Sequence, residues 1–160
     1  MFWILLFLAQ GAASSQLDRG EALFNDTTNG CVSCHALKGK GTAVGPDLKG
    51  ISRLSPKGIA MAIRSTVTQY VQTAKVKNGG TFPSMTGTPE GENVVVFDLS
   101  KTPPEKQTVA KADVTFSPNA GWKHPPGAKK MDDEQIADLV AFIRFAGAGN
   151  RQPVSPEDVQ

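Results

Sequence analysis

The chain has 160 residues, of which 39% are hydrophobic and 20% charged, and its formal net charge is +2. This length suits one compact domain, and the ordinary composition excludes a disordered chain, a collagen-like fibre and a bundle of membrane helices. The charge is too small and too scattered for a nucleic-acid-binding surface, because no run of Lys and Arg could follow a phosphate backbone. We therefore expect a single globular domain with one functional site.

Residues 1–15 have the pattern of an export signal. An apolar stretch from Phe2 to Ala9 precedes small residues that end at Ser15, like the apolar region and cleavage site of a secretory leader. No basic residue precedes this stretch, and it is shorter than the about 20 residues of a membrane-spanning helix. We interpret the segment as a signal peptide for the periplasm or the cell exterior. A retained membrane anchor and a helix packed on the domain are the alternatives.

An amphipathic stretch from Leu17 to Phe24 predicts a short helix, and the motif Cys31-Val32-Ser33-Cys34-His35 follows it. A structural zinc site needs four ligands, whereas the chain has two cysteines and two histidines in total. A thioredoxin-like redox pair expects a βαβ setting, and the sequence predicts no buried strand before the motif. A plain disulfide leaves His35 unexplained.

Covalent haem attachment accounts for all three residues of this C-x-x-C-H motif. Two thiols at this spacing can bond both vinyl groups of one porphyrin, and the next residue can present its imidazole to the iron. We therefore expect one haem c, attached at Cys31 and Cys34, with His35 as an iron ligand.

The middle of the chain changes from helical to β-prone patterns. Ser55-Pro56 is typical of a helix start, and this helix should run to about Thr66. Beyond Tyr70, Asn78-Gly79-Gly80 is a strong turn signal, and stretches rich in Val, Thr and Phe surround it. Two of these stretches are Val94–Phe97 and Val109–Phe116. We expect three or four short strands here.

The last helix gives the clearest pattern. Asp132 can cap it with Gln135 at the third position, and Gly147 can end it. Apolar residues recur on one helical face at Ile136, Leu139, Val140 and Ile143. We expect a helix that buries this face in the core, followed by a C-terminal tail over residues 148–160.

With these elements in place, the chain resembles the class I cytochromes c from Leu17 to about Ala146. The resemblance implies a mainly α, cytochrome c-like helical haem fold over residues 16–147. The β-prone stretches depart from the family pattern, and we expect them to form a small β-rich insertion at about residues 70–117. The resemblance also implies that Gly20 and Phe24 of the first helix meet Leu139 and Phe142 of the last. By the same analogy the carbonyl of Pro46, in the loop Gly45–Gly50, accepts a hydrogen bond from His35 and fixes its ring.

The resemblance places the second iron ligand in a loop before the last helix, where the family usually has Met followed by Pro. His124, in His124-Pro125-Pro126, lies eight residues before Asp132 and occupies that position. Met85, in Pro83-Ser84-Met85, has a ligand-like context but lies among the expected strands. We favour His35 and His124 as the two iron ligands, which would lower the redox potential. Met85, Met61, Met131 and an open sixth position are the alternatives.

These features favour a one-electron carrier between protein redox partners. The sequence contains no nucleophile and base pair, no second cluster of metal ligands and no phosphate-binding loop, so we expect no enzymatic activity. Lysines flank the motif and the presumed ligand loop and could attract an acidic partner; they are Lys38, Lys40, Lys123, Lys129 and Lys130. A haem sensor or small-ligand binder with a displaceable sixth ligand is the rival, and a peroxidase-like enzyme a weaker one. A further alternative is a subunit of a larger electron-transfer complex that docks through the insertion.

Overall fold

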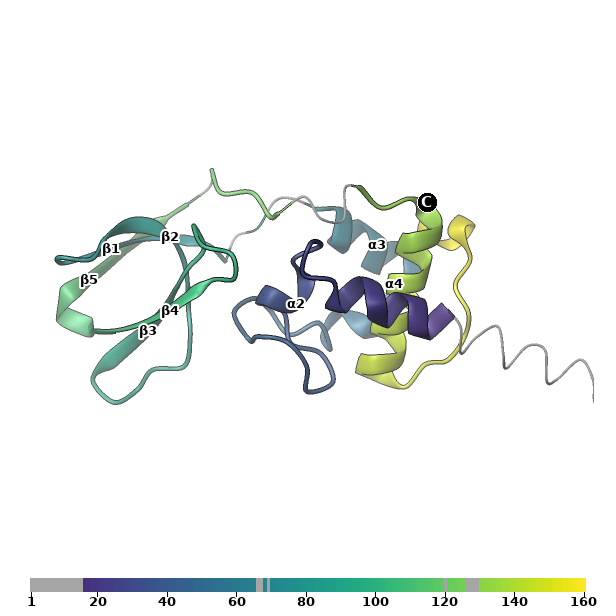
Figure 1. Ribbon diagram of the computed structural model, residues 1–160, viewed down its shortest axis with the longest axis horizontal. Helices are drawn as coiled ribbons and strands as arrows, with labels where there is room; N and C mark the ends of the chain where they lie inside the picture. The colour runs from purple at the N-terminus through teal and green to yellow at the C-terminus, as the bar shows by residue number, and fades with distance from the viewer. Residues whose placement is uncertain (1–15, 66–67, 69, 120, 126–129) are drawn as a thin grey trace, which may run out of the picture.

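The computed structural model describes residues 16–65, 68, 70–119, 121–125 and 130–160, so the expected signal peptide lies outside the described residues. A helical part and a β-sheet lie at opposite ends of the molecule (Figure 1). The helical part contains a first helix, described over residues 16–25, and α2 (Cys31–Cys34), α3 (Pro56–Arg64) and α4 (Asp133–Ala148). Short 3-10 helices that the structure describes in full include η1 (Ile51–Arg53), η2 (Lys111–Asp113) and η4 (Pro156–Val159).

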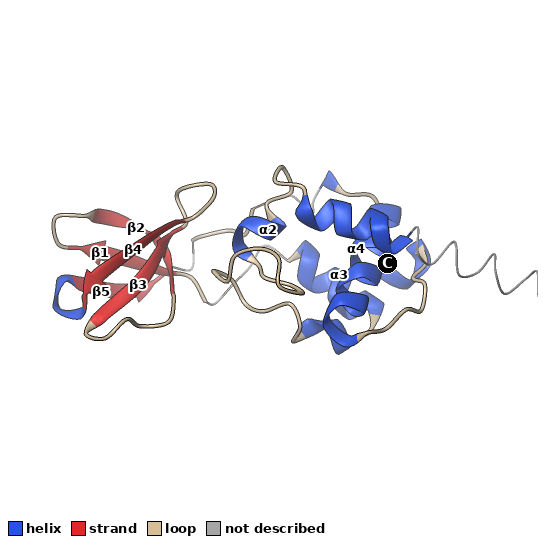
Figure 2. Ribbon diagram, turned by 60° about the horizontal axis from the view of Figure 1, so that its bottom comes forward, coloured by secondary structure: helices blue, strands red, loops and turns tan. Residues whose placement is uncertain are grey.

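The expectation of a mainly α fold is wrong, because a five-stranded antiparallel sheet forms one whole end of the molecule. Its strands are β1 (Gln72–Val76), β2 (Gly80–Thr86), β3 (Asn93–Asp98), β4 (Glu105–Ala110) and β5 (Val114–Pro118). Figure 2 shows the strands gathered on one side and the haem-motif helix α2 at the end of the helical part that faces them. The chain is therefore an α+β protein, and the sheet is large enough to bury a core of its own.

The sheet is a meander that returns to its start. Its strand order is β4-β3-β2-β1-β5, so β5 pairs with β1 after the first four strands have paired in sequence. The edge strands β4 and β5 are separated in the chain only by η2, so the sheet must curl until its edges approach at this corner. The curl encloses a small apolar cluster of Ala74, Val76, Phe82, Val96 and Val114.

A local signal accounts for the first turn of the sheet, but the number of strands was underestimated. The turn predicted at Asn78-Gly79-Gly80 joins β1 to β2, and both Asn78 and Gly80 have positive φ angles. The stretch Val109–Phe116, expected to be continuous, is broken by η2 into the end of β4 and the start of β5. Whether the sheet is an insertion relative to the family stays a prediction.

The helical core is built on α4, as the sequence predicted. Asp132 and Gln135 form the expected capping box at its start. The predicted apolar face is buried, and the ring of Phe142 lies 5.8 Å from that of Phe24, between centroids. Gly20 is also needed at this crossing, because a Cβ atom there would overlap the carbonyl oxygen of Asp138 and approach Phe142 Cβ to 2.7 Å.

The sequence predicted the start of α3 correctly but placed the end of α4 at the wrong glycine. Ser55 caps α3 and accepts a hydrogen bond from the Gly58 N–H, with Pro56 in the first turn, as expected; the expected end at Thr66 lies outside the described residues. Gly147 does not end α4, which continues to Ala148 and is capped by Gly149 at a φ of 71°. Gly147 instead allows close packing of α4 against Ser52, because a Cβ atom at position 147 would lie 2.5 Å from Ser52 Cβ.

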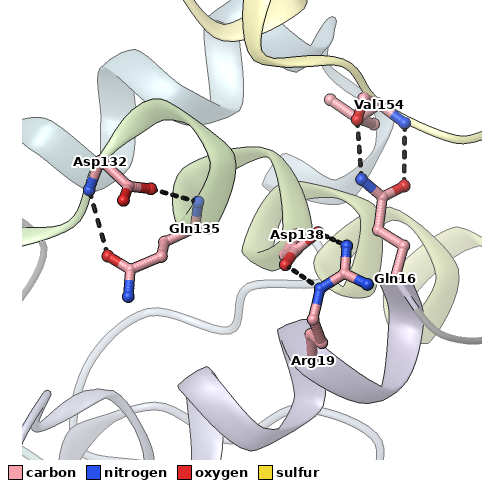
Figure 3. Close-up of polar contacts among 6 residues, drawn as sticks. All are labelled: Gln16, Arg19, Asp132, Gln135, Asp138 and Val154. Carbon is pink, nitrogen blue, oxygen red and sulfur yellow. Dashed lines mark hydrogen bonds and ion pairs between the residues drawn. The ribbon is translucent and has the colours of Figure 1, made fainter.

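Polar contacts fasten the first helix to the C-terminal part of the chain (Figure 3). The Arg19 guanidinium donates to both carboxylate oxygens of the buried Asp138, at 2.6 and 2.8 Å. The Gln16 amide exchanges two hydrogen bonds with the backbone of Val154. The segment after α4 therefore packs on the domain, and Val154 and Val159 join its apolar core.

Candidate haem site

The haem motif forms a single helical turn. Cys31 and Cys34 are the first and last residues of α2, and Gly30 precedes it in a left-handed conformation with φ of 76°. Neither cysteine is disulfide-bonded. Burial raises the pKa of the Cys31 thiol and that of the Cys34 thiol above their ordinary values. Both groups are therefore protonated thiols near neutral pH, three residues apart on one turn and facing the same side.

The loop after α2 fixes the ring of His35. Its Nδ1 lies 2.8 Å from the Pro46 carbonyl oxygen, which can only accept, so Nδ1 carries the proton and Nε2 keeps its lone pair. Gly45 lies against the ring, because a Cβ there would approach His35 Cε1 to 2.7 Å. Burial lowers the pKa of His35, the Pro46 carbonyl acts in the opposite sense, and neighbouring His124 lowers it further. The imidazole is thus held neutral, as a metal ligand must be.

His124 lies opposite His35. The two ring centroids are 6.1 Å apart and the ring planes differ by 27°. The Nδ1 of His124 lies 3.0 Å from the Pro125 carbonyl oxygen, which can only accept, so Nδ1 carries a proton and Nε2 is the nitrogen that could bind a metal. Within the described residues neither Nε2 has a hydrogen-bond partner. The fold therefore brings the two histidines of the chain together across 89 residues of sequence.

Trp122 packs edge-on against the ring of His124, with centroids 6.3 Å apart and planes at 82°. Its own backbone N–H donates to the Asn119 side chain at 3.0 Å, which shapes the loop. Sequence reasoning missed both Trp122 and Gly45, although each lies within two residues of a predicted site residue. Their position in the chain was the only available signal, since a ring contact of this kind depends on the tertiary fold.

The three methionines that are alternative candidates for the sixth ligand differ in burial and in their position relative to the histidine pair. Met85, on β2, is half-buried and lines the same cavity as His35 and His124. Met61 is 65% exposed on α3, and Met131 packs against the helical core. Met85 therefore remains a rival of His124 at the sixth position.

A sequence model of the cytochrome c family matches residues 17–100, more than half of the chain. The chain belongs to the cytochrome c family. No curated protein matches this cytochrome. The matched segment includes the C-x-x-C-H motif and Met85 and ends before His124, so it covers one candidate for the sixth ligand and not the other.

Family membership implies that this cytochrome binds haem c covalently and transfers electrons. Family members are generally electron carriers rather than enzymes, and they usually act in the periplasm or outside the cell. Among the described residues, no helix is both long and apolar enough to cross a membrane.

The residues around the histidine pair fit a haem. A cavity of about 280 Å³ reaches from His35 and His124 into the helical core, with both Cys31 and Pro46 on its wall. Most of its remaining wall is apolar, as a porphyrin requires, and includes Phe24, Leu48, Ile51, Leu139 and Ile143. A second cavity of about 60 Å³ adjoins it on the side of Cys34 and Met85. The two cysteines, the two imidazole rings and an apolar wall thus line two adjoining cavities.

Proposed function

We propose that this cytochrome is a one-electron carrier with a single haem c, bonded to Cys31 and Cys34, whose iron is ligated by His35 and His124. The bound haem would supply an iron that alternates between the ferrous and ferric states. The protein's own residues would hold the iron ligands in a fixed geometry, so that the charge of the iron could change with little movement of the ligands. No nucleophile or proton-transfer group is needed for this function.

The spacing of the two imidazole rings is the observation that best supports the proposal. Metal–imidazole bonds are about 2.0 Å long, so two such bonds in line, with half a ring on each side, separate the ring centroids by about 6 Å. The two rings here are 6.1 Å apart, and in each the Nδ1–H donates to a backbone carbonyl, which leaves Nε2 as the nitrogen for a metal. A separation of this size would allow both rings to bind one iron.

Spectroscopy of variants tests the sixth ligand. We expect the ferric wild type to be low-spin and to lack the weak near-infrared sulfur-to-iron band. His124→Ala should convert the ferric iron to high-spin, as seen in absorption and electron paramagnetic resonance spectra, whereas Met85→Ala should leave the spectra unchanged. The near-infrared band in the wild type, or a spin change in Met85→Ala alone, would show that Met85 is the ligand.

A haem sensor or small-ligand binder is the second candidate, because His124 donates its Nδ1–H to the adjacent Pro125 carbonyl rather than to a distant part of the fold, so this ring could leave the iron. Carbon monoxide separates the two functions, because it binds ferrous iron only where the sixth ligand is absent or leaves readily. Slow, weak binding by the ferrous wild type supports the carrier, and prompt, tight binding supports the sensor.

We also propose that residues 1–15 direct export, so that this cytochrome works in the periplasm or outside the cell with protein redox partners. The leader-like pattern of these residues and the usual location of the family support this location. A fractionation experiment on cells that express the full chain would test it, with N-terminal sequencing of the haem-loaded product.

A further inference from the structure

The fold holds His35 and His124 in different ways. The Nδ1–H of His35 donates to the carbonyl of Pro46, eleven residues along the chain, and Gly45 lies against the His35 ring. The Nδ1–H of His124 donates to the carbonyl of the next residue, Pro125. Because this acceptor belongs to the same loop, it ties the His124 ring to the loop and not to the rest of the fold. An orientation that faces His35 therefore needs a further contact.

Trp122 supplies a contact of this kind. Its ring plane is nearly perpendicular to that of His124, at 82°, and the two ring centroids are 6.3 Å apart. The torsion that turns an imidazole about its Cβ–Cγ bond is broad, so the rotamer preference of His124 does not select one ring plane. An indole in edge-to-face contact favours one plane, because an imidazole that turns loses this contact or runs into the indole.

Distant parts of the chain surround Trp122. It is half-buried and lies on the walls of two adjoining cavities, of about 60 and about 260 Å³. Asn29 and Gly30, next to the haem motif, and Leu99, which follows β3, lie on both walls as well. Trp122 thus links the loop that carries His124 to the helical part and to the sheet, which the hydrogen bond of His124 does not do.

We propose that Trp122 is a positioning residue, which holds the His124 ring nearly parallel to the His35 ring and so keeps it on the haem iron. This inference rests on the proposed ligation of the iron by both histidines. The planes of the two imidazole rings differ by 27°. Because an indole N–H can only donate, Trp122 acts through His124 and is not itself an iron ligand.

The indole also separates the two cavities beside His124. Without it, the imidazole plane is free to turn, and the cavities of about 60 and about 260 Å³ merge next to the sixth position of the iron. Removal of Trp122 should therefore change the angle between the two rings and give small external ligands easier access to the iron. These two effects are measured separately.

Electron paramagnetic resonance of the ferric, haem-loaded protein reports the angle between the rings, because the two imidazole planes set the splitting of the iron d orbitals. Nearly parallel planes give a rhombic low-spin spectrum with three resolved g values, whereas perpendicular planes give one dominant, large g value. We expect the rhombic spectrum for the wild type and for Trp122→Phe, which keeps an aromatic ring. Trp122→Ala and Trp122→Leu should instead contain the form with the large g value.

Cyanide binding is the second measurement, because cyanide competes with His124 for ferric iron. We expect Trp122→Ala to bind cyanide about ten-fold more tightly than the wild type in an absorbance titration, at the upper end of the effect of one aromatic contact. Leu99→Ala is the matched control, because Leu99 is also half-buried and lies on the same two cavity walls. This variant should keep the rhombic spectrum and the cyanide affinity of the wild type.

Two results would overturn the positioning role. One is a wild-type spectrum and cyanide affinity in both Trp122→Ala and Trp122→Leu. The other is an equal change in Leu99→Ala, since the apolar wall and not the indole would then hold the ring. Trp122→Leu keeps much of the apolar volume, so it carries the test even where Trp122→Ala does not bind haem.

Failure of the proposed ligation gives a different result. A near-infrared sulfur-to-iron band in the wild type, or an unchanged ferric spectrum in His124→Ala, would remove His124 from the iron and overturn both proposals. If the wild type has two histidine ligands and the Trp122 variants match it, only the positioning role is wrong.

Discussion

The position of His35 depends on a residue with no side chain. Gly45 lies so close to the imidazole that a Cβ atom would come within 2.7 to 3.2 Å of three ring atoms. Without a side chain at Gly45, the ring can lie directly against the backbone while its Nδ1–H donates to the Pro46 carbonyl oxygen. A second-shell bond of this kind fixes the tautomer and orientation of a metal-binding histidine.

We therefore expect Gly45→Ala to push the His35 ring away from the Pro46 carbonyl and weaken its bond to the iron. Loss of such an outer partner typically lowers metal affinity by about 10- to 100-fold. The ferric protein should gain a high-spin fraction, visible in absorption and electron paramagnetic resonance spectra.

Gly50→Ala is the matched control in the same loop, because a Cβ there would make only an ordinary contact of 3.5 Å with the Asp47 carbonyl oxygen. If Gly45→Ala and Gly50→Ala both gave the wild-type spin state, the role of Gly45 would be disproved.

At the scale of elements, the crossing of the first helix with α4 sets the position of the haem motif. The first helix ends six residues before Cys31, so any shift of this helix is passed on to α2. The crossing depends on close backbone approach at Gly20, the Phe24–Phe142 ring contact and the Arg19–Asp138 ion pair. An added methyl group at Gly20 has no space, because the atom it would meet belongs to the backbone of α4.

Gly20→Ala should therefore lower the free energy of unfolding by about 3 kcal/mol, at the upper end of the usual cost of overpacking. Ala22→Ser, which adds one heavy atom at an exposed position of the same helix, should change it by less than about 0.5 kcal/mol. Urea denaturation of the haem-loaded protein measures both values. Similar stabilities for the two variants would mean that the helices can separate at Gly20 without cost.

The elements that the sequence predicted well are those encoded by a few neighbouring residues. The caps at Ser55 and Asp132 and the turn at Asn78–Gly80 each depend on local chemistry, and all were confirmed. Gly147 was misread because a glycine can serve either a cap or close packing, and only the contact with Ser52 distinguishes them. The approach of Trp122 to His124 has no local signal, so this part of the site could not be foreseen.

At the scale of the whole molecule, the described residues form two apolar cores, and this is where prediction from the sequence failed. The β-prone stretches were recognised, but the return of β5 to β1 joins residues about forty positions apart and leaves no trace in local patterns. This pairing joins the short strands into one curled sheet with its own buried cluster. The separate clusters around Val96 and Val140 imply that the sheet and the helical part lose structure in separate steps.

Matched substitutions in the two cores test that expectation, because Val96 and Val140 are both fully buried. Val96→Ala should destabilise the sheet by about 2 kcal/mol, the cost of a small buried cavity. In hydrogen-exchange mass spectrometry of the haem-loaded full chain, amides of β1–β5 should then exchange roughly 30-fold faster, while those of α4 keep their protection. Val140→Ala should have the opposite pattern. Equal acceleration of both parts in both variants would instead require a single cooperative unit, in which the sheet could not move or open independently of the haem-binding helices.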